Sequence, residues 1–146
     1  MLIHESSYVE TGNIGEGTKI WHFCHIDKDV LIGKNCVIGQ GCYIAGGVRI
    51  GDNCHIQNGV SLFGGIILGN DVFIGPHAVF TNVRKPSAKK KQNYERTFIK
   101  DGAVIGAGAC IRCGVVIGKD SFVGMGAIIL KDVKDGQTVV GKGEEL

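Results

Sequence analysis

The sequence predicts an all-β fold, a parallel β-helix of hexapeptide repeats with about six to seven coils, and three observations support this. Aliphatic residues recur at every sixth position over most of the chain. Glycine, asparagine or aspartate fills a second fixed slot of the repeat, and one long insertion interrupts the period. A period of six fits neither an isolated strand nor an α-helix, but it is typical of a solenoid in which short strands stack on one another.

A periodic apolar residue, aliphatic everywhere except at Phe80, occupies the first slot of each repeat. Its members are Ile14, Ile20, Ile26, Ile32, Ile38, Ile44, Ile50, Ile56, Leu62, Leu68, Ile74 and Phe80, then Ile99, Ile105, Ile111, Ile117, Val123 and Ile129. Three repeats would close one triangular coil, so residues eighteen apart should stack about 4.8 Å from each other. Residues 3–13 add a partial coil, which joins the regular run after a slip of one residue.

The fifth slot holds small or β-branched residues, so side chains from slots five and one should both point into the core. Four of the six cysteines share this slot, namely Cys24, Cys36, Cys42 and Cys54. In this position cysteine is expected to act as a small buried apolar residue. No Cys-x-x-Cys pair has a matching partner pair, which argues against a structural zinc site.

The fourth slot contains mainly glycine, asparagine and aspartate, the residues that tolerate a left-handed backbone. We therefore expect each corner of the coil to place one residue at positive φ. The exceptions to this composition are Phe23, His77 and Val83.

The insertion covers residues 84–98, with the sequence RKPSAKKKQNYERTF. It should leave the prism as an external loop and return to the core at Ile99. Loops on a rigid scaffold commonly carry function. The rest of the chain keeps one repeat, so residues 1–146 are expected to form a single domain.

The composition excludes several classes of partner. The chain has sixteen basic and fourteen acidic residues, so it lacks the large excess of positive charge that is typical of nucleic-acid-binding proteins. No apolar run approaches membrane-spanning length, and the first residues lack the basic and apolar segments of a signal peptide. We expect a cytoplasmic protein with no membrane insertion and no nucleic-acid partner.

One corner of the predicted coil stacks His22, Gln40 and Asn58 into a polar ladder, with Trp21 and Gln57 beside it. Two interpretations remain open. The ladder stiffens the stack or forms a subunit contact, or it is a wall whose amide and imidazole groups orient a polar ligand.

A second corner carries Thr81 and Asn82 where the long loop leaves, and Arg112 and Cys113 should stack near it. An exposed Thr-Asn pair at the root of a loop is a candidate reaction centre. The alternative is that Asn82 only caps the exit of the loop.

Two histidines are candidates for proton transfer, because an imidazole gains and loses a proton near neutral pH. His77 occupies a turn slot, where a structural role is the alternative, and His25 should point outward from a strand. The spacing of the histidines does not match a zinc site, so no metal is expected.

Three segments in order, Trp21–Phe23 (WHF), Ile56–Asn58 (IQN) and Phe80–Asn82 (FTN), resemble the hexapeptide-repeat N-acetyltransferases that act on nucleotide-linked 3-amino sugars. The resemblance covers nearly the whole chain. Such enzymes acetylate UDP- or dTDP-linked amino sugars for bacterial surface polysaccharides, including lipopolysaccharide. The resemblance implies a left-handed coil, acetyl-CoA as co-substrate, and a homotrimer with active sites between subunits.

The resemblance also implies roles for individual residues. Asn82 would contact the sugar amine, with His25 or His77 as the best candidate if a general base is needed. The sugar-nucleotide pocket would be lined by His22, Gln40, Gln57, Asn58 and, from the basic loop, Arg84. The late coils around Gly108, Gly126 and Lys131 would hold the pantetheine arm and the phosphates of the coenzyme.

Two other functions compete with this one. O-acetylation of a sugar or of serine would need an indispensable histidine, because a hydroxyl is a poor nucleophile without a base. A non-enzymatic structural β-helix would favour a flat threonine-rich face, which the chain lacks.

Overall fold

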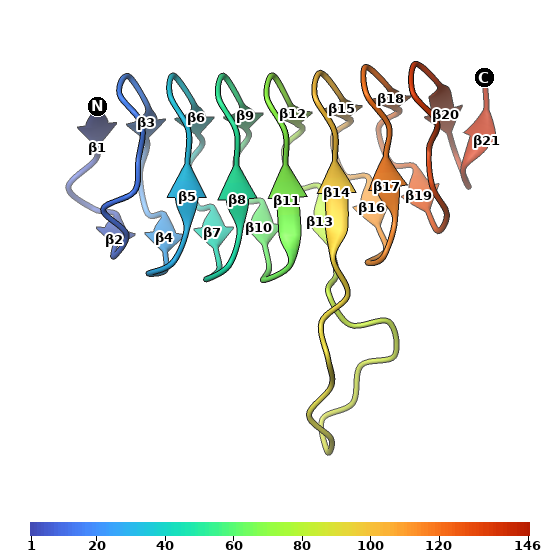
Figure 1. The fold of residues 1–146 in the computed structure, drawn as a ribbon, viewed down its shortest axis with the longest axis horizontal. Coiled ribbons are helices and arrows are strands. Elements are labelled where there is room, and N and C mark those ends of the chain that lie inside the picture. Colours follow the sequence, from blue (N-terminus) through green and yellow to red (C-terminus); the bar gives the residue numbers. More distant parts are fainter.

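A computed structural model describes residues 1–146 and confirms an all-β solenoid of parallel stacked coils (Figure 1). Three sheets form the sides of the prism. Sheet A contains β1 (Leu2–Ile3), β3 (Lys19–Ile20), β6 (Val37–Ile38), β9 (His55–Ile56), β12 (Phe73–Ile74), β15 (Val104–Ile105), β18 (Phe122–Val123), β20 (Thr138–Val140) and the antiparallel β21 (Glu144–Glu145). Sheet B contains β2 (Tyr8–Val9), β4 (His25–Ile26), β7 (Tyr43–Ile44), β10 (Ser61–Leu62), β13 (Val79–Phe80), β16 (Cys110–Ile111) and β19 (Ile128–Ile129). Sheet C contains β5 (Leu31–Ile32), β8 (Arg49–Ile50), β11 (Ile66–Leu68), β14 (Thr97–Ile99) and β17 (Val116–Ile117).

The chain visits the sheets in the order A, B, C, so each coil has three corners, which we name A–B, B–C and C–A after the sheets they join. Strands of one sheet pair in parallel at the expected spacing, as in Ile20 with Ile38 and Ile38 with Ile56. The one-residue slip near the N-terminus is also present, since Ile3 pairs with Ile20. The solenoid has about eight turns, one more than expected, because β20 continues the parallel stack of sheet A beyond the regular run.

The core is a narrow column built from slots one and five. It forms a single cluster of 33 buried residues. The four cysteines of slot five are buried, as predicted, and their thiols donate to main-chain carbonyls, with Cys24 Sγ 3.1 Å from the Gly39 oxygen. These contacts satisfy the weak S–H donor inside an otherwise apolar column.

The corners adopt the predicted left-handed backbone at every fourth slot except two, Val83 and Asp132. Val83 begins the external loop. At Asp132 the coil is shorter, because Val133 bridges to Ile117, and the corner no longer has room for the usual turn. Phe23, with φ of 57°, is unusual because a bulky side chain seldom adopts this conformation.

The external loop projects from the side of the prism between β13 and β14 (Figure 1). It is shorter at its end than the predicted 84–98, because Thr97 and Phe98 belong to β14. Their backbones pair with Ile66 and Ile67 of β11, so the ladder of sheet C captures them before the chain reaches Ile99. The structure contains no helix that could cross a membrane.

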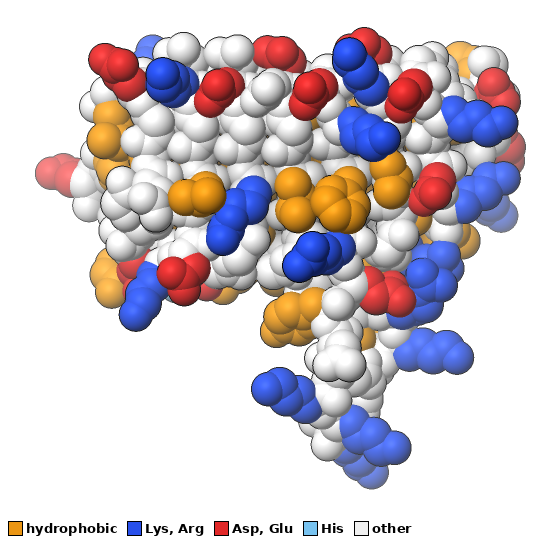
Figure 2. Space-filling model, in the orientation of Figure 1, with side chains coloured by type: hydrophobic (Ala, Val, Ile, Leu, Met, Phe, Trp, Pro, Cys, Tyr) orange, Lys and Arg blue, Asp and Glu red, His pale blue; other side chains and the backbone are white.

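The C–A corner repeats one hydrogen bond from coil to coil. The amide of Lys34 donates to Asp52 Oδ1, the amide of Asp52 to Asn70 Oδ1, and the amide of Asn70 to Asp101 Oδ1, each at 2.8 Å. Charged side chains line this edge of the prism, along the top of Figure 2. The corner is therefore an ordinary solvated edge with a structural ladder.

Candidate functional site

The residues predicted to form the site lie on both sides of sheet B rather than at one place in the chain. The A–B corner carries His22, Gln40, Gln57, Asn58, His77, Gly108 and Gly126. The B–C corner carries Asn82, Arg84 and Lys131, and His25 lies on the outer face of sheet B between the two corners. One side of the prism separates the two groups within one chain.

The polar ladder of the A–B corner has a structural component. Asn58 Oδ1 accepts a hydrogen bond from the Gln40 amide at 2.9 Å, which is the same contact that the C–A corner repeats. Gly39 leaves the space for it, since a Cβ there would lie 2.4 Å from Asn58 Oδ1. The side chains of Gln40 and Gln57 have no partner within the chain, so they remain available to a ligand.

The N-terminal end of this ladder is an aromatic stack. The His22 ring lies on the His4 ring, with centroids 3.6 Å apart. His4 Nδ1 contacts Ser6 Oγ at 2.8 Å, and the Phe23 amide donates to the same oxygen at 2.9 Å. Sequence analysis missed His4 and Ser6 because they lie in the irregular first coil. The available signal was Phe23, a bulky residue in a turn slot that otherwise favours glycine, asparagine and aspartate.

His77 is exposed at the A–B corner with φ of 57°, and its ring covers Gly59. A Cβ at Gly59 would lie 2.4 Å from both Cε1 and Nδ1 of that ring. Gly108 and Gly126 continue the column above His77, both with φ of 68°, and a Cβ on either would meet nothing within 4 Å. At this corner the imidazole therefore fills the space over Gly59, whereas the space over Gly108 and Gly126 is open.

His25 lies in a cluster of its own on sheet B. Its Nε2 is 3.2 Å from Asp27 Oδ1 and 3.5 Å from Glu10 Oε1. Tyr43 donates its hydroxyl to Asp27 Oδ2 at 2.8 Å, and this hydrogen bond raises the pKa of Tyr43. The ligand atoms of Glu10, His25 and Asp27 lie within 4.8 Å of one another, so these are the residues that could hold a cation.

The structure does not bring His25 to Asn82. Asp27, which faces His25, stacks below Thr81 with two further coils between them, which places the two groups roughly 14 Å apart along the prism. His77 and Asn82, in contrast, flank the same strand, β13, and belong to one layer.

Asn82 both caps the loop and presents a free oxygen. Its main-chain carbonyl accepts from the Glu95 amide at 2.8 Å, which closes the loop at its root. Its side-chain Nδ2 donates to the Gly64 carbonyl at 3.2 Å. Because the amide nitrogen is engaged, Oδ1 has no partner within the chain and can accept a hydrogen bond from outside.

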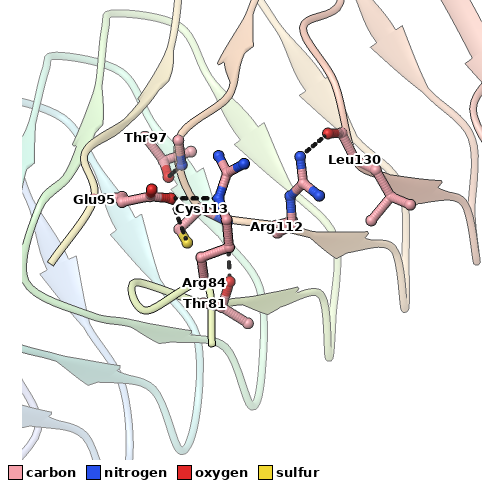
Figure 3. Close-up of polar contacts among 8 residues, drawn as sticks. Thr81, Arg84, Glu95, Thr97, Arg112, Cys113 and Leu130 are labelled. Atoms are coloured by element: carbon pink, nitrogen blue, oxygen red, sulfur yellow. Dashed lines mark hydrogen bonds and ion pairs between the residues drawn. The ribbon is translucent and has the colours of Figure 1, made fainter. Parts of the chain in front are cut away.

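A polar network surrounds the root of the loop (Figure 3). The Cys113 amide donates to Thr81 Oγ1 at 2.9 Å, and the Cys113 thiol donates to Glu95 Oε2 at 3.2 Å. Arg84 Nε donates to the same carboxylate oxygen at 3.1 Å. Cys113 stacks at this corner as the sequence predicted, whereas Glu95 was missed because it lies in the insertion, where the repeat gives no register.

The ionisation of this network is set by its contacts. Burial, and then the hydrogen bond to Glu95, raises the pKa of the Cys113 thiol. The hydrogen bond from Cys113, and then the one from Arg84, lowers the pKa of the Glu95 carboxyl. Glu95 is thus an anion held between a neutral thiol and a guanidinium, and Cys113 is not a thiolate nucleophile.

An open groove of about 410 Å³ lies beside this network. Its lining is Arg84, Arg112, Gly114, Val115, Leu130, Lys131 and Asp132. Arg112 Nη2 donates to the Leu130 carbonyl. Arg84 and Lys131, which sequence analysis gave to two different ligands, therefore line one groove.

Comparison with known proteins gives two matches to sequence families. The family described as bacterial transferase hexapeptide (six repeats) matches residues 47–82 and 96–131. The family described as hexapeptide repeat of succinyl-transferase matches residues 29–63, so the two together cover more than half of the chain. No curated protein sequence matches it significantly.

Solved structures similar to the chain include three bacterial proteins. The acetyltransferase domain of PglB from Neisseria gonorrhoeae, in complex with acetyl-coenzyme A, has a TM-score of 0.73 and 24% identity, over 84% of this chain and 54% of that one. WeeI from Acinetobacter baumannii has a TM-score of 0.59 and 26% identity, over 99% and 57%. A perosamine N-acetyltransferase mutant from Caulobacter crescentus, in complex with CoA and GDP-perosamine, has a TM-score of 0.51 and 26% identity, over 99% and 55%. The chain spans little more than half the length of these proteins.

Proposed function

The chain belongs to the hexapeptide-repeat transferases, and we propose that it transfers the acetyl group of acetyl-CoA to the amine of a UDP- or dTDP-linked 3-amino sugar. Two kinds of similarity support this. The perosamine N-acetyltransferase at 26% identity was solved with CoA and a nucleotide-linked sugar. The ordered WHF, IQN and FTN segments resemble enzymes of that substrate class. We place the reaction in the cytoplasm, in the synthesis of a surface polysaccharide such as lipopolysaccharide.

The observation that carries the proposal is the orientation of Asn82. Its Nδ2 is held by the Gly64 carbonyl, so Oδ1 is an acceptor of fixed direction at the root of the loop. An amine nucleophile has N–H groups to donate to such an acceptor, and the contact would direct its lone pair toward an acyl carbon. Asn82 is not a base, so its role is to bind and align the amine.

We propose that the complete site forms between subunits of a homotrimer. In a threefold assembly each subunit presents one surface to a different surface of its neighbour. If the threefold axis is parallel to the prism, the A–B corner of one subunit can meet the B–C corner of the next at the same height. Since His77 and Asn82 share a layer, they would then face each other across the interface, whereas His25 would not.

The chemistry required of the chain is modest. The amine nitrogen attacks the thioester carbonyl, a C–N bond forms, the C–S bond breaks, and the proton lost by nitrogen balances the thiolate that leaves. We assign the acceptance of that proton to His77, and alignment of the amine supplies the larger part of the rate. A main-chain N–H would stabilise the oxyanion of the tetrahedral intermediate.

The two substrates would approach Asn82 from opposite ends of the prism. Gln40 and Gln57, with free amide groups, lie in layers before Asn82 and suit the nucleotide-linked sugar. Gly108 and Gly126 lie in layers after it and leave the corner open for the pantetheine arm.

The experiment that tests the proposal is a screen of nucleotide-linked 3-amino sugars with acetyl-CoA, following the release of free thiol. Each amino sugar is paired with the analogue that has a hydroxyl at the same carbon. We expect thiol release with at least one amine and none with its hydroxyl partner. Release with hydroxyl acceptors alone would replace the proposal by O-acetylation, and no release with any acceptor would contradict an enzymatic role.

A further inference from the structure

We propose that the groove at the B–C corner binds a phosphate ester, and that Glu95 and Cys113 position Arg84 as its anion-binding group. The groove can be tested without turnover, so the inference rests on the proposed function only for the identity of the ligand. Phosphate esters are present both in coenzyme A and in a nucleotide-linked sugar, and the experiment separates these two sources.

The charge of the groove favours an anion. Arg84, Arg112 and Lys131 contribute three cations, and Asp132 is the one acidic residue in the lining. Asp132 is already engaged, because its Oδ1 accepts from the Val116 amide at 2.9 Å. Guanidinium groups bind phosphate oxygens well because their N–H groups form a planar fork.

The two arginines are held in different ways. Arg112 is half-buried, its Nη2 donates to the Leu130 carbonyl, and its Nε is buried without a partner. Arg84 is exposed on the loop, and only its Nε is engaged by Glu95. The terminal nitrogens of Arg84 have no partner within the chain, so they remain free to donate to a phosphate in the groove.

The position of Arg84 depends on a chain of contacts that ends in the core. Cys113 is buried, and its amide is fixed by Thr81 Oγ1 while its thiol donates to Glu95 Oε2. The same oxygen accepts from Arg84 Nε, so the carboxylate joins the exposed guanidinium to the coil. Figure 3 shows the three side chains converging from the loop and from the coil that follows it.

Gly114 completes the arrangement. Its φ is 86°, and a Cβ there would lie 2.9 Å from both Arg84 Nη2 and Glu95 Oε2. The ion pair thus lies directly over the backbone of residue 114. Without Glu95 and Cys113, Arg84 would be an exposed side chain that loses its rotamer freedom each time it binds an anion.

Cys113 is a positioning residue and not a catalytic one. It is fully buried and its thiol donates to Glu95, so it acts on a ligand through Glu95 and Arg84. Its effect should therefore appear in the affinity for phosphate and vanish when Arg84 is absent.

The groove is tested by calorimetric titration of the intact protein with four probes: CoA, 3′-dephospho-CoA, UDP and dTDP. We expect Arg84→Ala and Arg112→Ala each to lower the affinity for one class of probe, the coenzymes or the nucleotides, by about tenfold. Lys34→Ala on the C–A corner should leave the affinity for every probe unchanged. Weakening confined to CoA assigns the groove to the coenzyme, and weakening confined to UDP or dTDP assigns it to the sugar nucleotide. If both arginine variants bind all four probes within twofold of the affinity of the unmodified protein, the groove is not a phosphate-binding site.

The positioning role is tested with Cys113→Ala and Cys113→Ser, using the probe that the first titration selects. Cys113→Ala should weaken the affinity for this probe a few-fold. Cys113→Ser should retain most of the affinity, because a hydroxyl still donates to Glu95. In an Arg84→Ala background, Cys113→Ala should cause no further loss of affinity. A fall in thermal stability with an unchanged dissociation constant would overturn the positioning role. If no amino sugar is acetylated while phosphate binding still depends on Arg84, the proposed function fails and the groove remains.

Discussion

The C–A and B–C corners are built from the same repeat, yet they differ in almost every contact. At the C–A corner one hydrogen bond recurs between successive coils, through Asp52, Asn70 and Asp101. At the B–C corner Asn82 bonds to the coil below, the chain leaves for the loop, and a Cys-Glu-Arg network replaces the ladder. The periodic corner stabilises the stack, and the aperiodic corner arranges polar groups for a ligand.

The A–B corner lies between these extremes. Asn58 forms the structural bond of the ladder, whereas Gln40 and Gln57 keep free amides and His77 occupies a strained turn. A departure from the repeat is thus informative only when its side chain is not already engaged by the next coil.

Gly51→Ala should damage the periodic corner most. A Cβ at residue 51 would lie 2.5 Å from the Gly69 carbonyl oxygen and from Asn70 Oδ1, so two coils would have to separate. We expect a loss of about 3 kcal/mol or more in the free energy of unfolding, measured by urea denaturation. Gly12→Ala is the control, because its Cβ meets nothing within 4 Å. Equal stability of the two variants would contradict the close packing at this corner.

Asn82→Ala should instead damage function. We expect turnover to fall by about a hundredfold, since the amine loses the acceptor that aligns it. The dissociation constant of the coenzyme should stay within twofold, because the Asn82 side chain is bonded to the preceding coil at Gly64. Steady-state kinetics and a CoA titration measure the two quantities, and unchanged turnover would remove Asn82 from the site.

Asp52→Ala and Asn58→Ala compare the same hydrogen bond at two corners. Each removes one acceptor from a main-chain amide, so each should cost about 1 kcal/mol in the free energy of unfolding. If Asn58 also binds the sugar nucleotide, its variant alone should raise KM for that substrate. Equal stability losses with an unchanged KM would make Asn58 purely structural.

Glu95→Gln should have the smallest effect on stability, and its effect should depend on pH. The pKa of Glu95 is lowered in the folded protein, so its stabilising contribution is complete above the ordinary carboxyl range and is lost as the pH falls through the lowered value. The unmodified protein should therefore exceed the variant in stability at neutral pH and lose that advantage in acid. Parallel stability curves for the two proteins would contradict the ion pair with Arg84.

Much of this structure could be predicted from sequence because each slot of the repeat has one physical demand. Burial selects aliphatic residues and cysteine in slots one and five, and a left-handed turn selects glycine, asparagine and aspartate in slot four. The same logic fails where the register is lost. The start of β14 at Thr97 depends on pairing with β11, and Glu95 and Ser6 are positioned by the loop and by the irregular first coil.

The candidate site was predictable in its parts but not in its arrangement. Periodicity placed Asn82 at the corner where the loop leaves and His77 in a turn slot, yet it could not show that Asn82 Nδ2 is engaged or that Arg84 and Lys131 share a groove. Such details depend on side-chain rotamers and on the return path of the loop, which no repeat encodes.

A site shared between subunits can be tested by complementation between two impaired variants. Asn82→Ala and His77→Ala chains are coexpressed with different tags, and mixed oligomers that carry both tags are purified and assayed for acetyl transfer. If the site joins Asn82 of one subunit to His77 of the next, one of the three interfaces in each mixed trimer is intact, so the purified mixed trimers should show about a third of the unmodified rate. Purified mixed oligomers with no more activity than either variant alone would contradict a site shared between the two corners.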